Sequence, residues 1–176
     1  MKFFRLLLLL LLAFQTQSEQ LKNILFVGNS YLYYNNSVHN YVEPMLREHH
    51  EYEIETKLSA IGGSKLHHHN IDHLLNPKNL NLDQQIDLLI MQGGSTEVVS
   101  EKDQEKFIQT VQQYSAKAQK LGVKTALYMT HAFTEADSRF EPNLIKKISK
   151  TYHAAGKESN SIVIPVGLAY EIAYKE

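Results

Sequence analysis

The sequence contains no cysteine among its 176 residues. This absence excludes disulfide bonds, thiol nucleophiles, iron–sulfur clusters and zinc sites built on thiolates. Positive charge is not in excess either, because 18 Lys and Arg residues stand against 19 Asp and Glu residues and leave a formal charge of −1. A dedicated nucleic-acid-binding protein is therefore not expected, since it would need basic residues to neutralise phosphates. The apolar fraction of 43% is normal for a globular domain and excludes disorder.

A long hydrophobic run is present only at the N-terminus. Two basic residues precede a nine-residue apolar run, 6–14, and a short polar stretch follows it. This order is typical of a secretory signal peptide, and the run is too short to span a bilayer as a stable helix. We expect residues 1–18 to be a signal peptide, although a retained N-terminal anchor is the alternative. Residues 19–176 then form one exported domain, periplasmic or extracellular, with no stable membrane span after cleavage.

After the leader, segments typical of strands alternate with segments typical of helices. The predicted strands are 23–28, 52–58, 86–91, 123–129 and 162–166. The predicted helices begin near residue 38, after the capping residue Ser100, at Pro142 and at Gly167, and Gly122 and Gly156 are expected to end the second and third. Pro44 predicts a kink or a break in the first helix. The alternation predicts one α/β domain with helices on both faces of a parallel sheet, and a ligand site beyond the carboxyl ends of the strands.

Glycine and serine follow three of these strands where each one ends. The turns are Gly28-Asn29-Ser30-Tyr31, Gly62-Gly63-Ser64 and Gln92-Gly93-Gly94-Ser95. The first turn lacks both Gly-x-Gly-x-x-Gly and Gly-Lys-Ser/Thr, so a nucleotide-binding flavodoxin-like domain is disfavoured. The turns favour an acyl-transfer site, in which a serine hydroxyl attacks and N–H groups with a side-chain amide stabilise the oxyanion.

Metal and cofactor sites are not expected. His69 and His73 are four residues apart and could chelate a metal on a helix, but no motif places a third ligand. A polar loop near the cleft is the preferred interpretation of the histidines around them.

The first turn also carries a resemblance to a known family. The segment from Ile24 to Tyr31 resembles the first motif of the SGNH/GDSL hydrolases, whose Gly-Asp-Ser follows the first strand. Ser30 matches the nucleophile of that family, and Asn29 stands where the family has Asp. Residues 61–64 resemble the second motif, and Gly63 matches the glycine whose N–H group binds the oxyanion.

The third turn is more similar to carbohydrate-esterase variants of that family, which carry Gln-Gly-Glu-Ser there. The resemblance implies that Gln92 donates to the oxyanion together with the N–H groups of Ser30 and Gly63, with Ser95 as the second choice for the side-chain donor. It also implies a three-layer α/β/α fold with a flavodoxin-like parallel sheet of five strands, in the order 2-1-3-4-5. The implied function is a serine ester hydrolase of esterase or acetylesterase type, acting on a small-molecule or carbohydrate ester.

The last motif of the family, Asp-x-x-His, has no match in this sequence. Its His is the base for the serine, but no Asp-x-x-His follows Ser138 and no histidine follows His153. We therefore expect a domain truncated before its base, with negligible activity. The alternative is a non-catalytic carbohydrate- or ester-binding protein, a pseudoenzyme on the same fold. Asn29, Tyr31 and His131 are the candidates for the cleft wall. His131 follows the fourth strand at the same edge of the sheet, so it is the histidine to consider as a substitute base, although a partly buried wall residue is the preferred interpretation.

Overall fold

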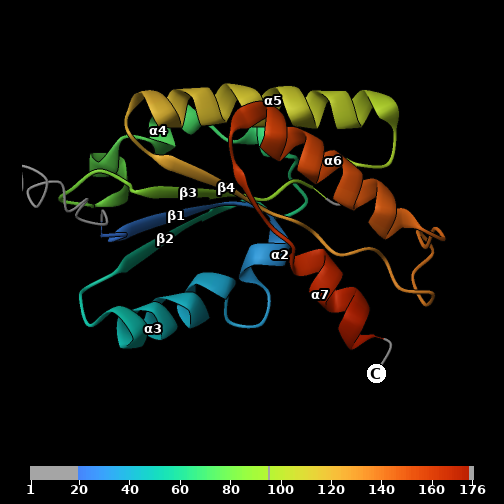
Figure 1. Cartoon of the computed structure of the whole chain (residues 1–176), viewed down its shortest axis with the longest axis horizontal. Coiled ribbons are helices and arrows are strands. Elements are labelled where there is room, and N and C mark those ends of the chain that lie inside the picture. The colour runs from blue at the N-terminus through green and yellow to red at the C-terminus, as the bar shows by residue number, and fades with distance from the viewer. Residues whose placement is uncertain (1–19, 95, 175–176) are drawn as a thin grey trace, which may run out of the picture.

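One parallel sheet of five strands forms the centre of the protein (Figure 1). The computed structural model describes residues 20–94 and 96–174, so the predicted signal peptide, 1–18, and Ser95 lie outside the described residues. The sheet order is β2-β1-β3-β4-β5 with every pairing parallel, which confirms the predicted order. The strands are β1 (Asn23–Gly28), β2 (Glu55–Ala60), β3 (Leu88–Met91), β4 (Lys124–Tyr128) and β5 (Ile162–Ile164).

Helices cover both faces of the sheet, which confirms the predicted three-layer α/β/α fold. The short helix α4 (Ile71–Leu74) and the long helices α5 (Glu101–Lys120) and α6 (Leu144–Ser159) lie on one side (Figure 1). The other side carries α2 (Ser30–Tyr33), α3 (Val38–His50) and α7 (Val166–Ala173). Two 3-10 helices, η1 (Leu66–His68) and η2 (Pro77–Leu80), come between β2 and β3 in the chain. In the part of the chain that the structure describes, no helix is both long and apolar enough to cross a membrane.

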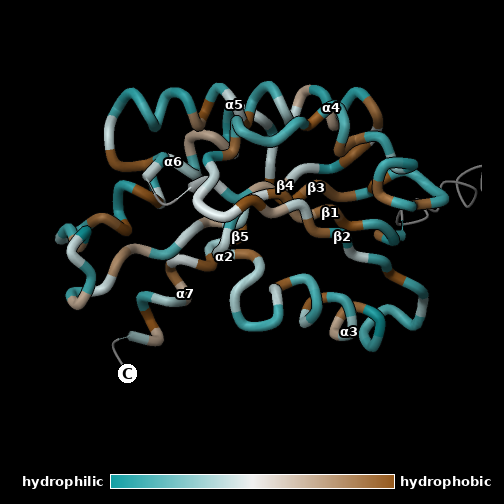
Figure 2. The backbone as a smooth tube through the Cα atoms, turned by 180° about the vertical axis from the view of Figure 1, so that it is seen from behind, coloured by the Kyte–Doolittle hydropathy of each residue, from teal (hydrophilic) through white to brown (hydrophobic). Residues whose placement is uncertain are grey.

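The core has two parts because successive side chains of a strand point to opposite faces of the sheet. Leu25 and Val27 of β1 belong to the cluster under α5 and α6, whereas Ile24 and Phe26 belong to the cluster on the α3 side. All residues of β1 are buried, as expected for a central strand covered by helices on both faces. Figure 2 shows the hydrophobic residues concentrated along the strands, with hydrophilic residues along the outer side of α5.

The helices differ from what was expected at one proline and one glycine. Helix α3 continues through Pro44 to His50, so no break occurs there, and the alternative of a kink stays a prediction. Gly156 does not end α6, which runs on to Ser159. A Cβ atom at Gly156 would lie 2.7 Å from a side-chain carbon of Val163, so the glycine lets α6 approach β5 closely. The predicted stop at Gly122 is confirmed, since α5 ends just before this residue, which has a φ of 79°.

Candidate active site

Ser30 lies at the carboxyl edge of the sheet, two residues after Gly28, the last residue of β1. Asn29 precedes it as the N-terminal cap of α2, and its Oδ1 accepts a hydrogen bond from the Tyr31 N–H group at 3.2 Å. Asn29 is only 4% exposed, whereas Ser30 is partly exposed. The change from strand to helix within two residues therefore presents the Ser30 hydroxyl at the edge where a ligand is expected.

The second glycine loop is bound directly to the first. The Asn29 Nδ2 group donates to the Ser64 carbonyl oxygen at 3.0 Å, and the Ser64 hydroxyl donates to the Gly28 carbonyl oxygen at 3.4 Å. The same hydroxyl lies 3.2 Å from His69 Nε2, whose ring is almost fully buried. Burial lowers the pKa of His69, so this histidine is neutral at pH 7. These bonds hold the second loop beside Ser30.

The third loop is bound to the first through Gln92. Its Oε1 accepts a hydrogen bond from the Asn29 N–H group at 2.9 Å, and its Nε2 donates to the Gly93 carbonyl oxygen. The side chain has no exposed surface. Donation to an oxyanion would require Nε2 to turn away from Gly93, so the predicted role of Gln92 as an oxyanion donor stays a prediction. Ser95, the second choice, lies outside the described residues.

Two backbone N–H groups at this edge have no acceptor in the part of the chain that the structure describes. No described residue accepts a hydrogen bond from the N–H group of Ser30 or from that of Gly63. Gly63 is exposed and has a φ of 67°, and a Cβ atom there would meet nothing within 4 Å. The two groups are the predicted oxyanion donors, and the bonds from Asn29 to Ser64 bring their loops together.

His131 lies beside the residue that follows Ser30. Its ring packs edge-on against the Tyr31 ring, with centroids 4.8 Å apart. It also packs against the Tyr170 ring, which is tilted by 35° with its centroid 4.8 Å away. Its Nδ1 lies 2.9 Å from the Ala132 carbonyl oxygen, which can only accept, so Nδ1 carries the proton and Nε2 is the basic nitrogen. The structure thus brings Asn29, Tyr31 and His131 together at the edge occupied by Ser30.

His69 and His73, the pair with metal-ligand spacing, have different partners in the structure. His69 faces Ser64, whereas His73 Nδ1 lies 3.1 Å from the Asn79 side-chain nitrogen at the surface. Among the described residues, no group of three or more His, Cys, Asp or Glu side chains could hold a metal ion.

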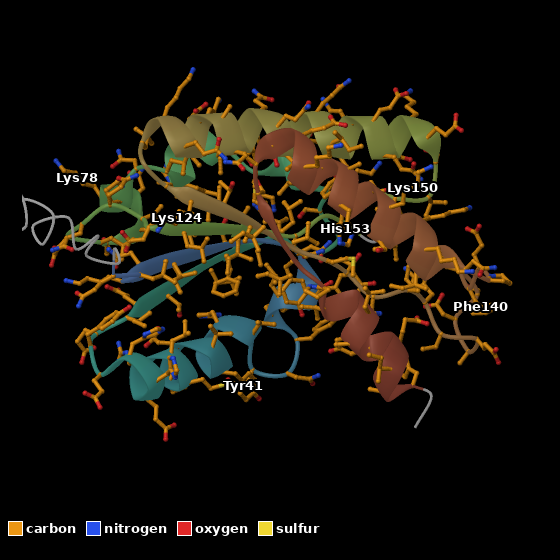
Figure 3. The ribbon with its side chains drawn as sticks, viewed as in Figure 1. Tyr41, Lys78, Lys124, Phe140, Lys150 and His153 are labelled. Carbon is orange, nitrogen blue, oxygen red and sulfur yellow. The ribbon has the colours of Figure 1, made fainter. Side chains whose placement is uncertain are left out.

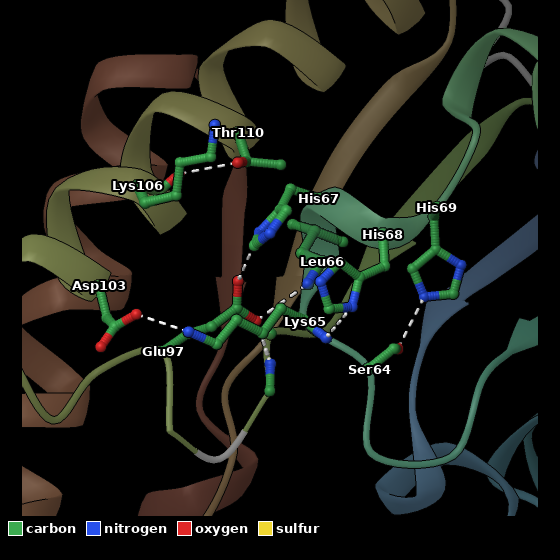
Figure 4. A network of polar contacts seen from close by, with 12 residues as sticks. Ser64, Lys65, Leu66, His67, His68, His69, Glu97, Asp103, Lys106 and Thr110 are labelled. Atoms are coloured by element: carbon green, nitrogen blue, oxygen red, sulfur yellow. Dashed lines mark hydrogen bonds and ion pairs between the residues drawn. The ribbon is translucent and has the colours of Figure 1, made fainter.

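Glu97 is the residue of this region that sequence analysis missed. It is only 1% exposed, and its Oε2 accepts hydrogen bonds from the N–H groups of Leu66 and Gly94 (Figure 4). Burial raises the pKa of its carboxyl group. The available signal was a single carboxylate placed directly before Val98 and Val99, after the third glycine turn.

A hollow lined by aromatic rings continues from His131. Its volume is about 340 Å³, and its aromatic lining consists of Phe133, Phe140 and Tyr174. The Tyr174 ring lies 6.0 Å from that of Tyr170, so rings follow one another from Tyr31 to the hollow. Phe140, labelled in Figure 3, is 41% exposed in the segment before α6. Glu135 and Glu171 also line the hollow, and the Arg139 guanidinium lies over the Phe133 ring, 4.0 Å from its centroid.

Comparison with known proteins supports the architecture. No protein-family model and no curated protein matches the sequence. AlinE4, an SGNH-hydrolase family esterase, superposes with a TM-score of 0.65 at 14% identity, over 86% of this chain and 79% of its own. The acetyl xylan esterase AlAXEase gives a TM-score of 0.61 at 19% identity, over 87% of this chain and 83% of its own. The chain has the SGNH-hydrolase fold.

A third protein of known structure with this fold is also named as an esterase of a carbohydrate ester. A variant of Axe2, an acetyl-xylooligosaccharide esterase from Geobacillus, gives a TM-score of 0.63 at 14% identity, over 88% of this chain and 80% of its own. At these identities the likeness establishes the SGNH-hydrolase fold, and the chemistry of this chain depends on the residues at its own sheet edge.

Proposed function

We propose that the carboxyl edge of this sheet is an ester hydrolase site in which Ser30 is the nucleophile. The observation that carries the proposal is the placement of a partly exposed serine between three bonded loops. Among the described residues, these loops offer no acceptor for the N–H groups of Ser30 and Gly63. Solved structures with the same fold that are named as esterases support this chemistry.

The reaction follows from these positions. The Ser30 Oγ atom bonds to the ester carbonyl carbon, and the carbonyl oxygen becomes an oxyanion that the two N–H groups stabilise. The alcohol then leaves with a proton, and water hydrolyses the acyl-serine to release the acid. Both steps need a base that accepts a proton, because a serine hydroxyl is a weak nucleophile by itself.

The base is the missing part of this arrangement. Among residues 20–94 and 96–174, no histidine hydrogen-bonds to Ser30, and the ring of His131 packs against Tyr31, the residue after Ser30, and against Tyr170. Loss of the base alone removes most of the catalysis of a serine triad. We therefore propose that the 176-residue chain turns over esters at a negligible rate.

The substrate class is proposed from the wall of the site. A hollow of about 340 Å³ with aromatic rings suits the acid or alcohol part of a small-molecule ester or a sugar ring. Its two glutamates can accept hydrogen bonds from hydroxyl groups of the substrate. Export of the protein, inferred from the leader, is part of this proposal and places the substrate outside the cytoplasm.

Hydrolysis of p-nitrophenyl acetate tests the nucleophile and the missing base together. The rates of the wild type and of Ser30→Ala are compared without and with imidazole, a soluble base that can take the place of an absent histidine. We expect no difference without imidazole and a saturable, Ser30-dependent rate with it. The Ser30→Ala protein with imidazole supplies the background rate of the free base.

Two other results would change the assignment. A Ser30-dependent rate without imidazole would contradict the negligible activity, and its loss in His131→Ala would identify His131 as the base. The absence of any Ser30-dependent rate, with saturable ligand binding that survives Ser30→Ala, would instead favour a binding protein on this fold.

A further inference from the structure

Glu97 joins the second and third glycine loops through one carboxylate oxygen. The Leu66 N–H group donates to Oε2 at 3.0 Å, and the Gly94 N–H group donates to the same atom. The two donors come from segments separated by 28 positions in the chain, and Glu97 is almost completely buried (Figure 4). A carboxylate that accepts hydrogen bonds from two separate loops fixes the position of one relative to the other.

The two loops touch each other where Glu97 holds them. A Cβ atom added to Gly94 would lie 2.9 Å from the Ser64 carbonyl oxygen and 3.2 Å from Glu97 Oε2. Ser64 directly follows Gly63, whose N–H group is a proposed oxyanion donor. A shift of the third loop away from Glu97 would therefore change the position of this donor.

The second oxygen of Glu97 has an unusual environment. Oε1 is buried without a hydrogen-bond partner among the described residues, and it lies 3.9 Å from His67 Nδ1, which is also without one. Burial, together with the neighbouring His68, Lys106 and Lys65, lowers the pKa of His67, so the contact is not an ion pair at pH 7. Lys65 itself is paired with Asp103 at 2.6 Å. The buried carboxyl group of Glu97 thus has no ion-pair partner among the described residues at pH 7.

We propose that Glu97 is a positioning residue of the ester hydrolase site, which sets the Gly63 donor relative to Ser30 by joining the second and third loops. This inference depends on the function proposed above. Burying a carboxylate is unfavourable, so a neutral side chain at position 97 would stabilise the folded protein more. The two N–H bonds that it accepts offer a reason for its presence.

Three variants test the proposal. Glu97→Ala removes the acceptor for both N–H groups. Glu97→Gln keeps an acceptor oxygen in the place of Oε2 and turns an amide N–H toward His67 Nδ1, which can accept in its neutral form. Asp103→Ala is the matched control, because it breaks the partly exposed ion pair with Lys65 of the same loop without removing an acceptor from either N–H group.

Two measurements are made on each protein. Amide hydrogen exchange is followed at Leu66 and Gly94, with Val111 in α5 as a reference for global unfolding. The imidazole-dependent, Ser30-dependent hydrolysis of p-nitrophenyl acetate gives kcat and KM below the melting transition of each variant. We expect Glu97→Ala to speed exchange at Leu66 and Gly94 more than tenfold, to leave Val111 unchanged, and to lower kcat about 10- to 100-fold with little effect on KM. Glu97→Gln and Asp103→Ala should stay within about threefold of the wild type.

The outcomes separate this inference from the proposed function. An unchanged kcat in Glu97→Ala, with only a lower melting temperature, would show a purely structural residue and overturn the inference. Unchanged exchange at Leu66 and Gly94 would overturn it as well. A wild type without any Ser30-dependent rate would overturn the proposed function and with it the positioning role, while faster exchange in Glu97→Ala would still establish the link between the loops.

Discussion

Substitution of Gly28 by alanine should damage the framework that positions Ser30. Gly28 is the last residue of β1, and its carbonyl oxygen accepts hydrogen bonds from the Ile61 N–H group and the Ser64 hydroxyl. A Cβ atom there would lie 2.5 Å from Gln92 Oε1 and 2.9 Å from Leu32 Cδ1. Neither side chain has exposed surface, so neither can move into solvent to make room.

The expected loss of stability has two parts. Inserting a methyl group into a well-packed core costs about 1–3 kcal/mol. Displacement of Gln92 Oε1 also removes the acceptor of the buried Asn29 N–H group, and an unsatisfied buried donor costs about 1–3 kcal/mol. We therefore expect Gly28→Ala to lower the free energy of unfolding by about 2–6 kcal/mol.

Urea denaturation followed by far-UV circular dichroism measures this loss. Gly62→Ala is the matched control, because a Cβ atom there meets only the Tyr33 hydroxyl, at 3.0 Å, and Tyr33 is 37% exposed. The control should unfold within about 1 kcal/mol of the wild type. If Gly28→Ala unfolds at the same urea concentration as Gly62→Ala with an equal slope, the contact between Gly28 and Gln92 does not limit the packing, and the reasoning is refuted.

Three further substitutions test other parts of the fold. Tyr152→Phe should lower the free energy of unfolding by about 1–3 kcal/mol in urea denaturation. The buried Gly93 N–H group donates to the Tyr152 hydroxyl at 3.0 Å and would lose its partner. An unchanged unfolding midpoint would contradict this. Pro44→Ala should raise the free energy of unfolding by about 1–3 kcal/mol, since alanine supplies an N–H group for the Asn40 carbonyl oxygen inside α3. A loss of stability would show that the proline is preferred there. Because the folded-state pKa of Glu97 is raised above its ordinary value of 4.5, its protonated form stabilises the fold at low pH, and this contribution is lost as pH rises through the raised pKa. The stability of the wild type relative to Glu97→Gln should therefore fall as pH rises above about 4.5, and a pH-independent difference would argue against a raised pKa.

Most of the fold could be predicted because its signals are local. The apolar run 23–28 has the same bounds as β1, and Ser100 caps α5 as expected, with its hydroxyl oxygen accepting from the Asp103 N–H group at 3.1 Å. The second strand was placed at 52–58 by its alternation, whereas β2 is Glu55–Ala60. Its bounds are set by pairing with β1, in which Asn23 lies opposite Glu55, and a periodic pattern does not contain that register.

The candidate site was predictable only in part, for a physical reason. A parallel sheet brings the residues that follow its strands to one edge, so Ser30, Gly63 and Gln92 could be placed together from strand order alone. The partners of each polar atom depend on distances between loops, and sequence spacing does not give those distances. Gln92 is predicted to donate to the oxyanion, and only the structure shows that its two amide atoms bond to Asn29 and Gly93.

Glu97 shows why such a residue escapes a search by motif. The groups that it binds are backbone N–H groups, which every residue except proline carries, so Leu66 and Gly94 leave no mark in the sequence. What the sequence does contain is a carboxylate beside two valines, in a segment where burial would make it unfavourable. A charged residue placed where the surrounding pattern predicts burial must find donors nearby, and at the end of a parallel strand those donors are the loops that form the site. A lone buried carboxylate after a strand is therefore a reason to look for loops that it joins, even where no motif includes it.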